Sequence, residues 1–282
     1  MKKILVPTDF SNLSKAAAYY AIGIARDIDA EIILLHTING GASPNALKNW
    51  EKLENSMINA AQNEADTMLS EIKISEGFNN ISYSHALGFP IKDVIAQFVM
   101  DNQIDLIVMG TTGASGLKKL IGSNTTSVME NSNVPVLVVP QLAHYRHIKE
   151  ILYASDMHNL SGEIKIVVRL ARLLEAHVNV VHGIKDDLDK NVQLLENAAI
   201  RSDKKDELIR TMDYPNIRLH VFRNESVVAL IDDFLGLQKI DLVIMFSGEL
   251  GFGDKLFQRS ETRKLAFHNE IPLLIYKKET RK

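Results

Sequence analysis

The sequence predicts an α/β protein of two tandem doubly wound domains, each with a five-stranded, mainly parallel sheet and helices on both faces. One reason is that each half alternates short apolar segments with helical patterns, as parallel strands joined by crossover helices do. The other is an internal repeat, in which four blocks recur in the same order with similar spacing. The paired blocks are Ile4–Asp9 with Ile151–Asp156, Glu31–His36 with His177–His182, Asp105–Met109 with Asp241–Met245, and Val134–Val139 with Ile271–Tyr276.

The elements of the first domain follow from hydrophobic periodicity. The predicted strands are Lys3–Pro7, Glu31–His36, Ile81–Leu87, Leu106–Met109 and Val136–Val139. Four helices are expected between them, and the fourth runs from Ser123 to Asn131. The other three are indicated by apolar stripes: Ala17, Ala21, Ile24 and Ile28; Leu53, Met57, Ala60, Met68 and Ile72; and Ile91, Val94, Ile95 and Phe98. The breakers Gly88 and Pro90 precede the third helix.

A short polar segment, Gln141–His147, separates the last strand of one copy from the first strand of the next. The domains are therefore predicted at residues 1–143 and 144–282. Because the linker is short, we expect the domains to pack together rather than to be loosely tethered.

Composition limits the classes of function. Apolar residues make up 46% of the 282 residues, enough for buried cores, and the net charge of −3 lacks the basic excess typical of nucleic-acid or membrane-surface binding. The absence of cysteine excludes thiolate chemistry and disulfides and fits a reducing compartment. Pro7 and Asp9 end the first apolar run too early for a secretory leader, and no run is long enough to span a bilayer. We expect a cytoplasmic protein with no nucleic-acid or membrane partner.

A glycine-rich stretch follows the strand Leu106–Met109 and carries Gly110, Gly113 and Gly122. Glycines let backbone amides approach an anion, and the helix expected from Ser123 presents unpaired N–H groups and a favourable dipole. The residues Ser123, Asn124 and Thr125 have side chains suited to capping that helix, and Lys118 and Lys119 can add charge. The stretch fits neither a Walker loop nor a Rossmann fingerprint. It predicts a phosphate cradle at the carboxyl end of a strand.

With these features the chain resembles the universal stress protein family in its tandem form. The resemblance is close over the first domain and holds in outline over the second. The residues that carry the resemblance are Val6–Ser11, Leu34–His36, Gly88-x-Pro90, Asp105–Gly110, the loop through Ser123, and Val134–Val139. The ATP-binding branch of that family has the signature G-x2-G-x9-G-[ST]. This chain has Gly110-x2-Gly113 and then eight residues before Gly122-Ser123, one fewer than the signature.

The resemblance implies an adenine nucleotide alpha hydrolase-like fold and an ATP site in the first domain, with Mg or Mn bridging phosphate oxygens. By position, Asp9 and the backbone near Thr37 would hold adenine and ribose, and Pro7 and Met109 would line the base pocket. The phosphates would be surrounded by Gly110, Gly113, Gly122, Ser123 and Asn124. Alternatively, Asp9 caps the following helix, and Thr37 and Met109 are core residues at strand ends.

The second copy has a different loop, in which Phe246, Glu249 and Arg259 stand where the first has Gly110, Gly113 and Gly122. A phenylalanine crowds the turn and a carboxylate repels phosphate, so we expect a degenerate domain. His36 and His182 occupy equivalent strand ends, which indicates a shared structural role. No histidine spacing indicates a metal site, and no general base is evident near the loop.

Three functions are compatible with these features. The first is a regulatory stress protein that binds ATP in its first domain. The second is a nucleotide-free scaffold, and the third is a slow ATPase or a protein that phosphorylates itself at Ser123 or Thr125. The resemblance also implies that the final strands Val134–Val139 and Ile271–Tyr276 meet in an internal pseudo-dimer, and two chains can associate further as a homodimer.

Overall fold

The computed structural model forms two compact units, Met1–Tyr145 and Arg146–Lys282. It describes residues 1–39, 47–111, 122–155, 160–184, 210–223, 227–247 and 271–277.

The first unit contains one five-stranded parallel sheet with the order β3-β2-β1-β4-β5. Its strands are β1 (Lys3–Pro7), β2 (Glu31–Ile38), β3 (Ile81–Leu87), β4 (Leu106–Gly110) and β5 (Val136–Val139). The predicted fold class is confirmed, and β1, β3 and β5 have the predicted bounds. The order builds outward in one direction from β1 to β3 and in the other from β4 to β5, so a topological switch point lies between β1 and β4.

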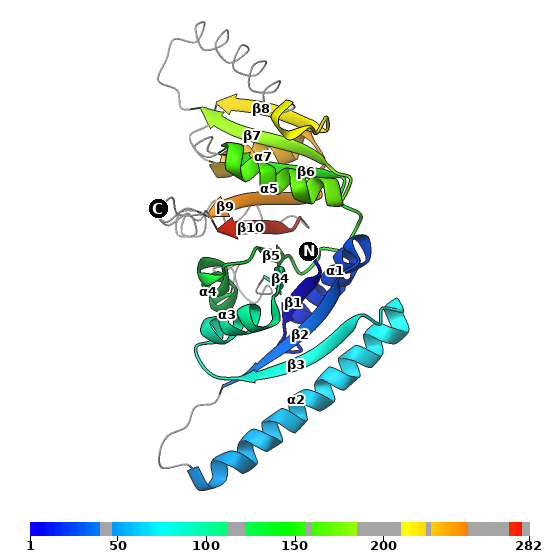
Figure 1. Cartoon of the computed structure of the whole chain (residues 1–282), viewed down its shortest axis with the longest axis vertical. Helices are drawn as coiled ribbons and strands as arrows, with labels where there is room; N and C mark the ends of the chain where they lie inside the picture. Colours follow the sequence, from blue (N-terminus) through cyan, green and yellow to red (C-terminus); the bar gives the residue numbers. More distant parts are fainter. Residues whose placement is uncertain are drawn as a thin grey trace, which may run out of the picture. The chain divides into compact units, whose positions relative to one another are not determined.

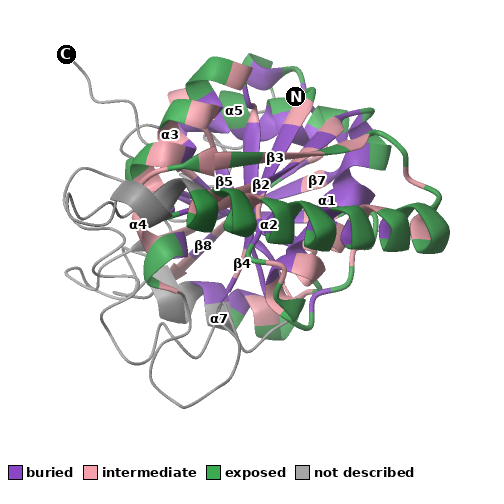
Figure 2. Cartoon of the chain, turned by 90° about the horizontal axis from the view of Figure 1, so that it is seen from below, coloured by how far each residue is buried: buried purple, intermediate pink, exposed green. Residues whose placement is uncertain are grey.

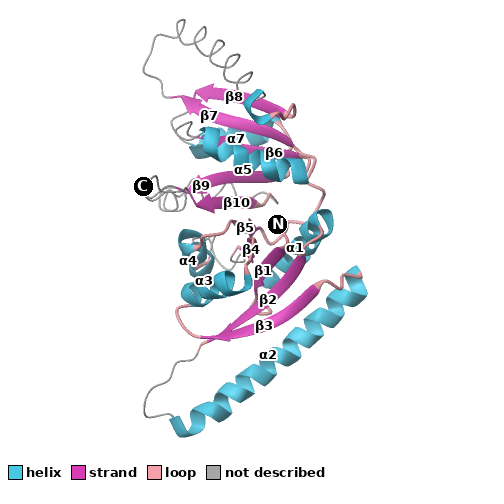
Figure 3. Ribbon diagram, viewed as in Figure 1, coloured by secondary structure: helices cyan, strands magenta, loops and turns pink. Residues whose placement is uncertain are grey.

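Four helices cover this sheet, and Figures 1 and 3 show their arrangement. They are α1 (Asn12–Ile28), α2 (Leu47–Glu76), α3 (Ile91–Asn102) and α4 (Ser123–Asn131). Because parallel crossovers are right-handed, reversal of direction at the switch point places α1 and α2 on one face and α3 and α4 on the other. The helices α3 and α4 pack against each other, and α1 packs against β1 and β4.

The apolar stripe predicted for α1 is confirmed, since its four residues are all buried. The stripe predicted for α2 is only partly right. Met68 and Ile72 are buried, whereas Leu53 is 51% exposed and Met57 is 37% exposed. Figure 1 shows α2 diverging from β3 toward its first residues, and Figure 2 shows the helix largely exposed. Periodicity identifies the face of a helix but not how far a neighbouring sheet extends along it.

The second unit repeats this topology with a parallel sheet of order β10-β9-β6-β7-β8. Its strands are β6 (Glu150–Ser155), β7 (His177–Ile184), β8 (Ile217–Arg223), β9 (Leu242–Ser247) and β10 (Leu273–Lys277), and its described helices include α5 (Leu160–Leu173) and α7 (Val227–Leu237).

One detail of local structure is repeated at the amino-terminal edge of both sheets. The Asp105 carboxylate accepts hydrogen bonds from the backbone N–H groups of Lys2 and Lys3, at 2.6 and 3.1 Å. Asp241 accepts the same pair from Lys149 and Glu150, at 2.9 and 3.0 Å. Each aspartate therefore ties the start of the central strand to the strand beside it. Within the described ranges, no helix is long and apolar enough to cross a membrane.

Candidate functional site

The switch point of the first sheet brings most of the predicted site residues to one edge. Pro7 ends β1, Gly110 ends β4 directly after Met109, and Thr37 lies one residue before the end of β2. Since all these strands are parallel and paired in register, their carboxyl ends share an edge, and Asp9 lies two residues beyond β1 at that edge. Ligands of open α/β sheets bind in the crevice at this position.

The Asp9 carboxylate is exposed and held in one orientation by Ser11. Its Oδ1 accepts hydrogen bonds from the Ser11 hydroxyl at 2.6 Å and from the Ser11 backbone N–H at 3.1 Å. Partial burial alone would raise the pKa of Asp9, but the hydrogen bonds from Ser11 outweigh it and hold this pKa below its usual value. The helix cap is Ser11, whose hydroxyl accepts from the N–H of Ser14, so Asp9 is not the N-cap of α1. Asp9 is therefore an ionised acceptor at the carboxyl-terminal edge of the first sheet.

A small polar network, which was not predicted from the sequence, fixes the turn between β1 and α1. The buried Thr8 hydroxyl donates to the Ser14 hydroxyl at 3.0 Å and accepts from the N–H of Phe10 at 3.0 Å. Phe10 has a φ of 60°, a left-handed conformation that is rare for a bulky residue and is found at functional sites. The closely spaced threonine and serines around Asp9 are the sequence signal for such local bonds.

The two histidines at equivalent strand ends make equivalent hydrogen bonds, which agrees with the shared structural role predicted for them. The Nδ1 of His36 lies 2.8 Å from the carbonyl oxygen of Thr8, and the Nδ1 of His182 lies 2.9 Å from that of Ser155. A carbonyl only accepts, so Nδ1 donates in both cases. His36 also stacks on Phe10, with ring centroids 5.0 Å apart. Both histidines therefore hold the end of a central strand to its neighbour.

The helix α4 presents an open amino terminus. Its N-cap is Gly122, which makes no side-chain capping bond, and its first turn carries no acidic residue. The side chains of Ser123 and Asn124 are exposed. The helix begins at Ser123 as predicted, but the prediction that Ser123, Asn124 or Thr125 caps it is wrong, because the N-cap is Gly122, which has no side chain to accept a hydrogen bond. Among the described residues no side chain caps the first amides, so these amides and the helix dipole can interact with an anion.

Two contacts position the start of α4 and the end of β4. One joins α4 to β4, and the other packs β4 against α1. The Thr125 hydroxyl donates to the carbonyl of Gly110 at 3.2 Å, which joins the first turn of α4 to β4. A Cβ atom at Gly110 would lie 2.6 Å from Leu13 Cγ and 2.9 Å from the Leu13 carbonyl oxygen. Gly110 is thus required for close packing of α1 against β4, whatever it does for a ligand. Met109 is buried, with 8% of its surface exposed.

The remaining predicted groups of the loop lie outside the described residues. These are Gly113, Lys118 and Lys119, and in the second copy Glu249 and Arg259.

The second sheet has a bulky side chain where the first has Gly110. Phe246, the counterpart of Gly110, is 5% exposed. Its ring stacks on Tyr276 at 5.1 Å and meets the edge of Tyr153 at 5.7 Å. Tyr153 is fully buried and its hydroxyl donates to the buried carboxylate of Glu163 on α5. Aromatic packing therefore fills this region of the second unit.

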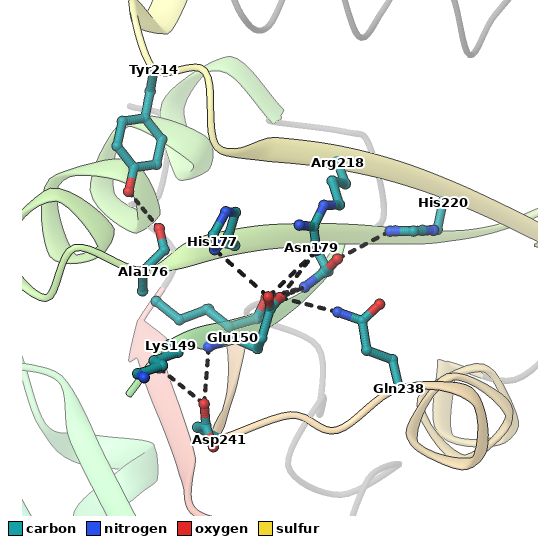
Figure 4. A network of polar contacts seen from close by, with 11 residues as sticks. Lys149, Glu150, Ala176, His177, Asn179, Tyr214, Arg218, His220, Gln238 and Asp241 are labelled. Carbon is teal, nitrogen blue, oxygen red and sulfur yellow. Dashed lines mark hydrogen bonds and ion pairs between the residues drawn. The ribbon is translucent and has the colours of Figure 1, made fainter. Parts of the chain in front are cut away.

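A larger polar network lies at the opposite, amino-terminal edge of the second sheet, and Figure 4 shows it. The fully buried Asn179 donates to Glu150 at 2.8 Å, and its oxygen lies 3.1 Å from His220 Nε2. Glu150 also accepts from Arg218 at 3.3 Å and from Gln238 at 3.0 Å. These bonds satisfy a buried amide and join three strands to the segment after α7, so we assign the network a structural role.

The described residues contain no group of three or more histidine, cysteine, aspartate or glutamate side chains placed to hold a metal ion. What the edge of the first sheet offers is an anion-binding helix terminus together with an ionised acceptor at Asp9. This arrangement suits a ligand with hydrogen-bond donors at one end and negative charge at the other.

Comparison with known proteins identifies the family. The model of the universal stress protein family matches residues 1–140. A universal stress protein of Methanocaldococcus jannaschii is 35% identical over 145 residues, which cover 49% of this chain and 81% of the relative. A second from the same organism is 33% identical over 162 residues, with 49% and 94% covered. The chain belongs to the universal stress protein family.

The solved structures show the same fold over the whole chain. A universal stress protein from Archaeoglobus fulgidus has a TM-score of 0.63 at 16% identity, covering 98% of this chain and 96% of its own. A putative universal stress protein from Pseudomonas aeruginosa has a TM-score of 0.61 at 16% identity, with 98% and 93% covered. At this identity the likeness concerns the fold alone.

Proposed function

We propose that this protein is a nucleotide-binding regulatory member of its family, with ATP in the crevice of the first unit. The observation that carries the proposal is the open amino terminus of α4 beside the carboxyl end of β4, across the switch point from Asp9. Unpaired amides at a helix start bind phosphate. The chain also keeps the glycines of the family's ATP signature with a loop one residue shorter.

The charges at Asp9 and at the start of α4 determine which end of the nucleotide binds at each. The ionised Asp9 repels phosphate and accepts from hydroxyl or amino groups, so the ribose and adenine lie at the end of β1 and beside Thr37. Pro7 and Met109 line the base, and the phosphates lie at Gly122, Ser123 and Asn124, with Gly110 and Gly113 in the loop before them. A divalent cation, Mg or Mn, would bridge phosphate oxygens and reduce their charge.

We propose further that the second unit binds no ATP and serves to pack and regulate. A phenylalanine in place of Gly110 cannot fit the close approach of α1 to β4 seen in the first unit, where even a Cβ atom is too large. The ring of Phe246 is buried there instead and stacks on the half-buried ring of Tyr276. The expected stoichiometry is one ATP per chain.

A pair of substitutions at Gly122 tests the phosphate site. Its φ of −65° and ψ of 151° are open to any residue, so Gly122→Asp and Gly122→Asn both supply a side-chain cap for α4. Only aspartate also adds a negative charge where phosphate should bind. By isothermal titration with ATP and Mg, we expect Gly122→Asp to weaken binding at least tenfold, about 1.4 kcal/mol, and Gly122→Asn to weaken it less, because its cap engages one amide without adding a charge. Equal affinities for the two variants would place the phosphates elsewhere.

The alternatives give different results in two direct measurements. A nucleotide-free scaffold carries no nucleotide in native mass spectrometry and gives no heat with ATP. A self-phosphorylating protein incorporates label from ATP, and Ser123 is then the expected acceptor, because it is exposed whereas the Thr125 hydroxyl is buried and donates to Gly110. The internal pseudo-dimer, a homodimer and a cytoplasmic location remain predictions.

A further inference from the structure

A cleft of about 610 Å³ runs along α1 in the first unit. One wall is a stripe of α1, the other is the segment Gln141–Tyr145 that follows β5, and Glu76 at the end of α2 closes one side. Its volume falls in the range of small-molecule sites, which is about 300–1,000 Å³. None of the predicted nucleotide residues that the structure describes lines it.

Aromatic side chains make the walls of this cleft. Tyr145 packs edge-on against Tyr20, with ring centroids 5.2 Å apart, and its hydroxyl donates to Asp27. Its ring lies against Gly23, where an added Cβ would be 2.1 Å from the ring atoms. Burial, together with Asp27, raises the pKa of Tyr145, so its hydroxyl stays neutral. Tyr19 adds a third ring whose hydroxyl makes no hydrogen bond within the described part of the chain.

Polar groups in the cleft remain available to a ligand. The side chains of Asn12, Gln141 and His144 line it and make no hydrogen bond or ion pair with any described residue. Two cations also line it, but α2 neutralises both. Lys15 pairs with Glu71 at 3.2 Å, and Arg26 pairs with Glu76 at 3.0 Å.

We propose that this cleft is a second ligand site, separate from the nucleotide crevice, for a planar aromatic molecule that is uncharged or carries one negative charge. The tyrosine rings stack on or meet the edge of the ligand ring. The free amides and the imidazole supply donors and acceptors that fix its orientation. A polyanion such as ATP is disfavoured, because the cations are already paired and Glu76 lies at the cleft.

The probe for the test is 8-anilinonaphthalene-1-sulfonate, which has aromatic rings, one negative charge and a fluorescence that rises on leaving water. The full chain should bind one equivalent saturably, and excess ATP with Mg should not displace it. Ala16 lines the cleft, so Ala16→Phe fills it, and we expect at least tenfold weaker binding. Tyr19→Ala, which removes one wall, should weaken binding about fivefold.

The matched control is Asn63→Phe, which adds the same ring at an exposed position of α2 outside the cleft. It should bind the probe as the parent does, and circular dichroism establishes that each variant is folded. Absence of saturable binding to the parent overturns the proposal. So does unchanged affinity in both Ala16→Phe and Tyr19→Ala, and so does displacement by ATP, which would place the probe in the nucleotide crevice.

Discussion

Gly23 provides the sharpest test of packing in the first unit. The effect of Gly23→Ala on the free energy of unfolding should change sign when Tyr145 is removed. A glycine inside a helix costs about 1 kcal/mol relative to alanine, so Gly23→Ala would ordinarily stabilise α1. Here the new Cβ would meet the Tyr145 Cγ and Cδ1 atoms at 2.1 Å and its Cβ at 2.7 Å. Contacts this short to the base of a side chain cannot be relieved by rotating its tip, so the tyrosine must leave its place.

The expected magnitude follows from what Tyr145 loses. Its hydrogen bond to the Asp27 carboxylate contributes about 1.5–3 kcal/mol, and the half-buried ring contributes about 1 kcal/mol more. Subtracting the helix gain leaves a net destabilisation of about 2 kcal/mol for Gly23→Ala. In a Tyr145→Ala background no ring opposes the new methyl group, so the same substitution should stabilise by about 1 kcal/mol. The coupling energy of the cycle is then about 3 kcal/mol.

Denaturant unfolding measured by far-UV circular dichroism suits this cycle, because both units contain helices and the unfolding of either one is detected. Gly236→Ala in α7 is the control, since no atom lies within 4 Å of the added Cβ and the change should be neutral or slightly stabilising in the second unit. If Gly23→Ala had the same sign with and without Tyr145, the packing of that ring on α1 would be refuted.

Three further predictions concern named contacts. Asp105→Ala and Asp241→Ala each remove two hydrogen bonds from backbone N–H groups and should each lower the unfolding free energy of their own unit by about 2 kcal/mol, measured in denaturant. The pKa of Asp9 is lowered in the folded state, so the ionised carboxylate stabilises the fold above its unfolded pKa, and this contribution is lost as pH falls through the folded pKa. Ser11→Ala removes the hydroxyl bond and should raise the pKa of Asp9 in an NMR titration. An unchanged pKa would contradict the assigned bonds. Gly110→Ala should cost about 2 kcal/mol, because the methyl group meets a backbone carbonyl of α1, and wild-type stability would show that the packing is looser.

Much of the fold could be predicted because it depends on patterns that the sequence carries locally. Three strands of the first sheet begin and end where the apolar runs do, and the repeat places four strands of the second sheet at equivalent positions. The extent of burial along α2 could not be predicted, since it depends on where the sheet ends. The role of Asn179, a buried amide within an apolar strand, could not be predicted either. Its hydrogen-bond partners come from two other strands, β6 and β8.

The candidate site shows the same division. Asp9 and Gly110 each lie at or just beyond the end of a predicted strand. Because the carboxyl ends of parallel strands lie at one edge of the sheet, this was enough to predict that the two residues share that edge. The sequence did not reveal that Gly110 is needed for packing against Leu13, since a glycine reads the same whether it admits a ligand or a helix. It also did not show that Gly122 would start α4 without a side-chain cap, because three capping residues follow it directly.

The central claim is that the first amides of α4 bind the phosphates of one ATP per chain. The most direct measurement is a titration of the isotope-labelled protein with ATP and Mg, followed through its backbone amide NMR signals. We expect saturation at one equivalent, with the amide signals of Ser123 and Asn124 among those that move most. Those two signals staying in place while ATP binds, or saturation at two equivalents, would contradict it.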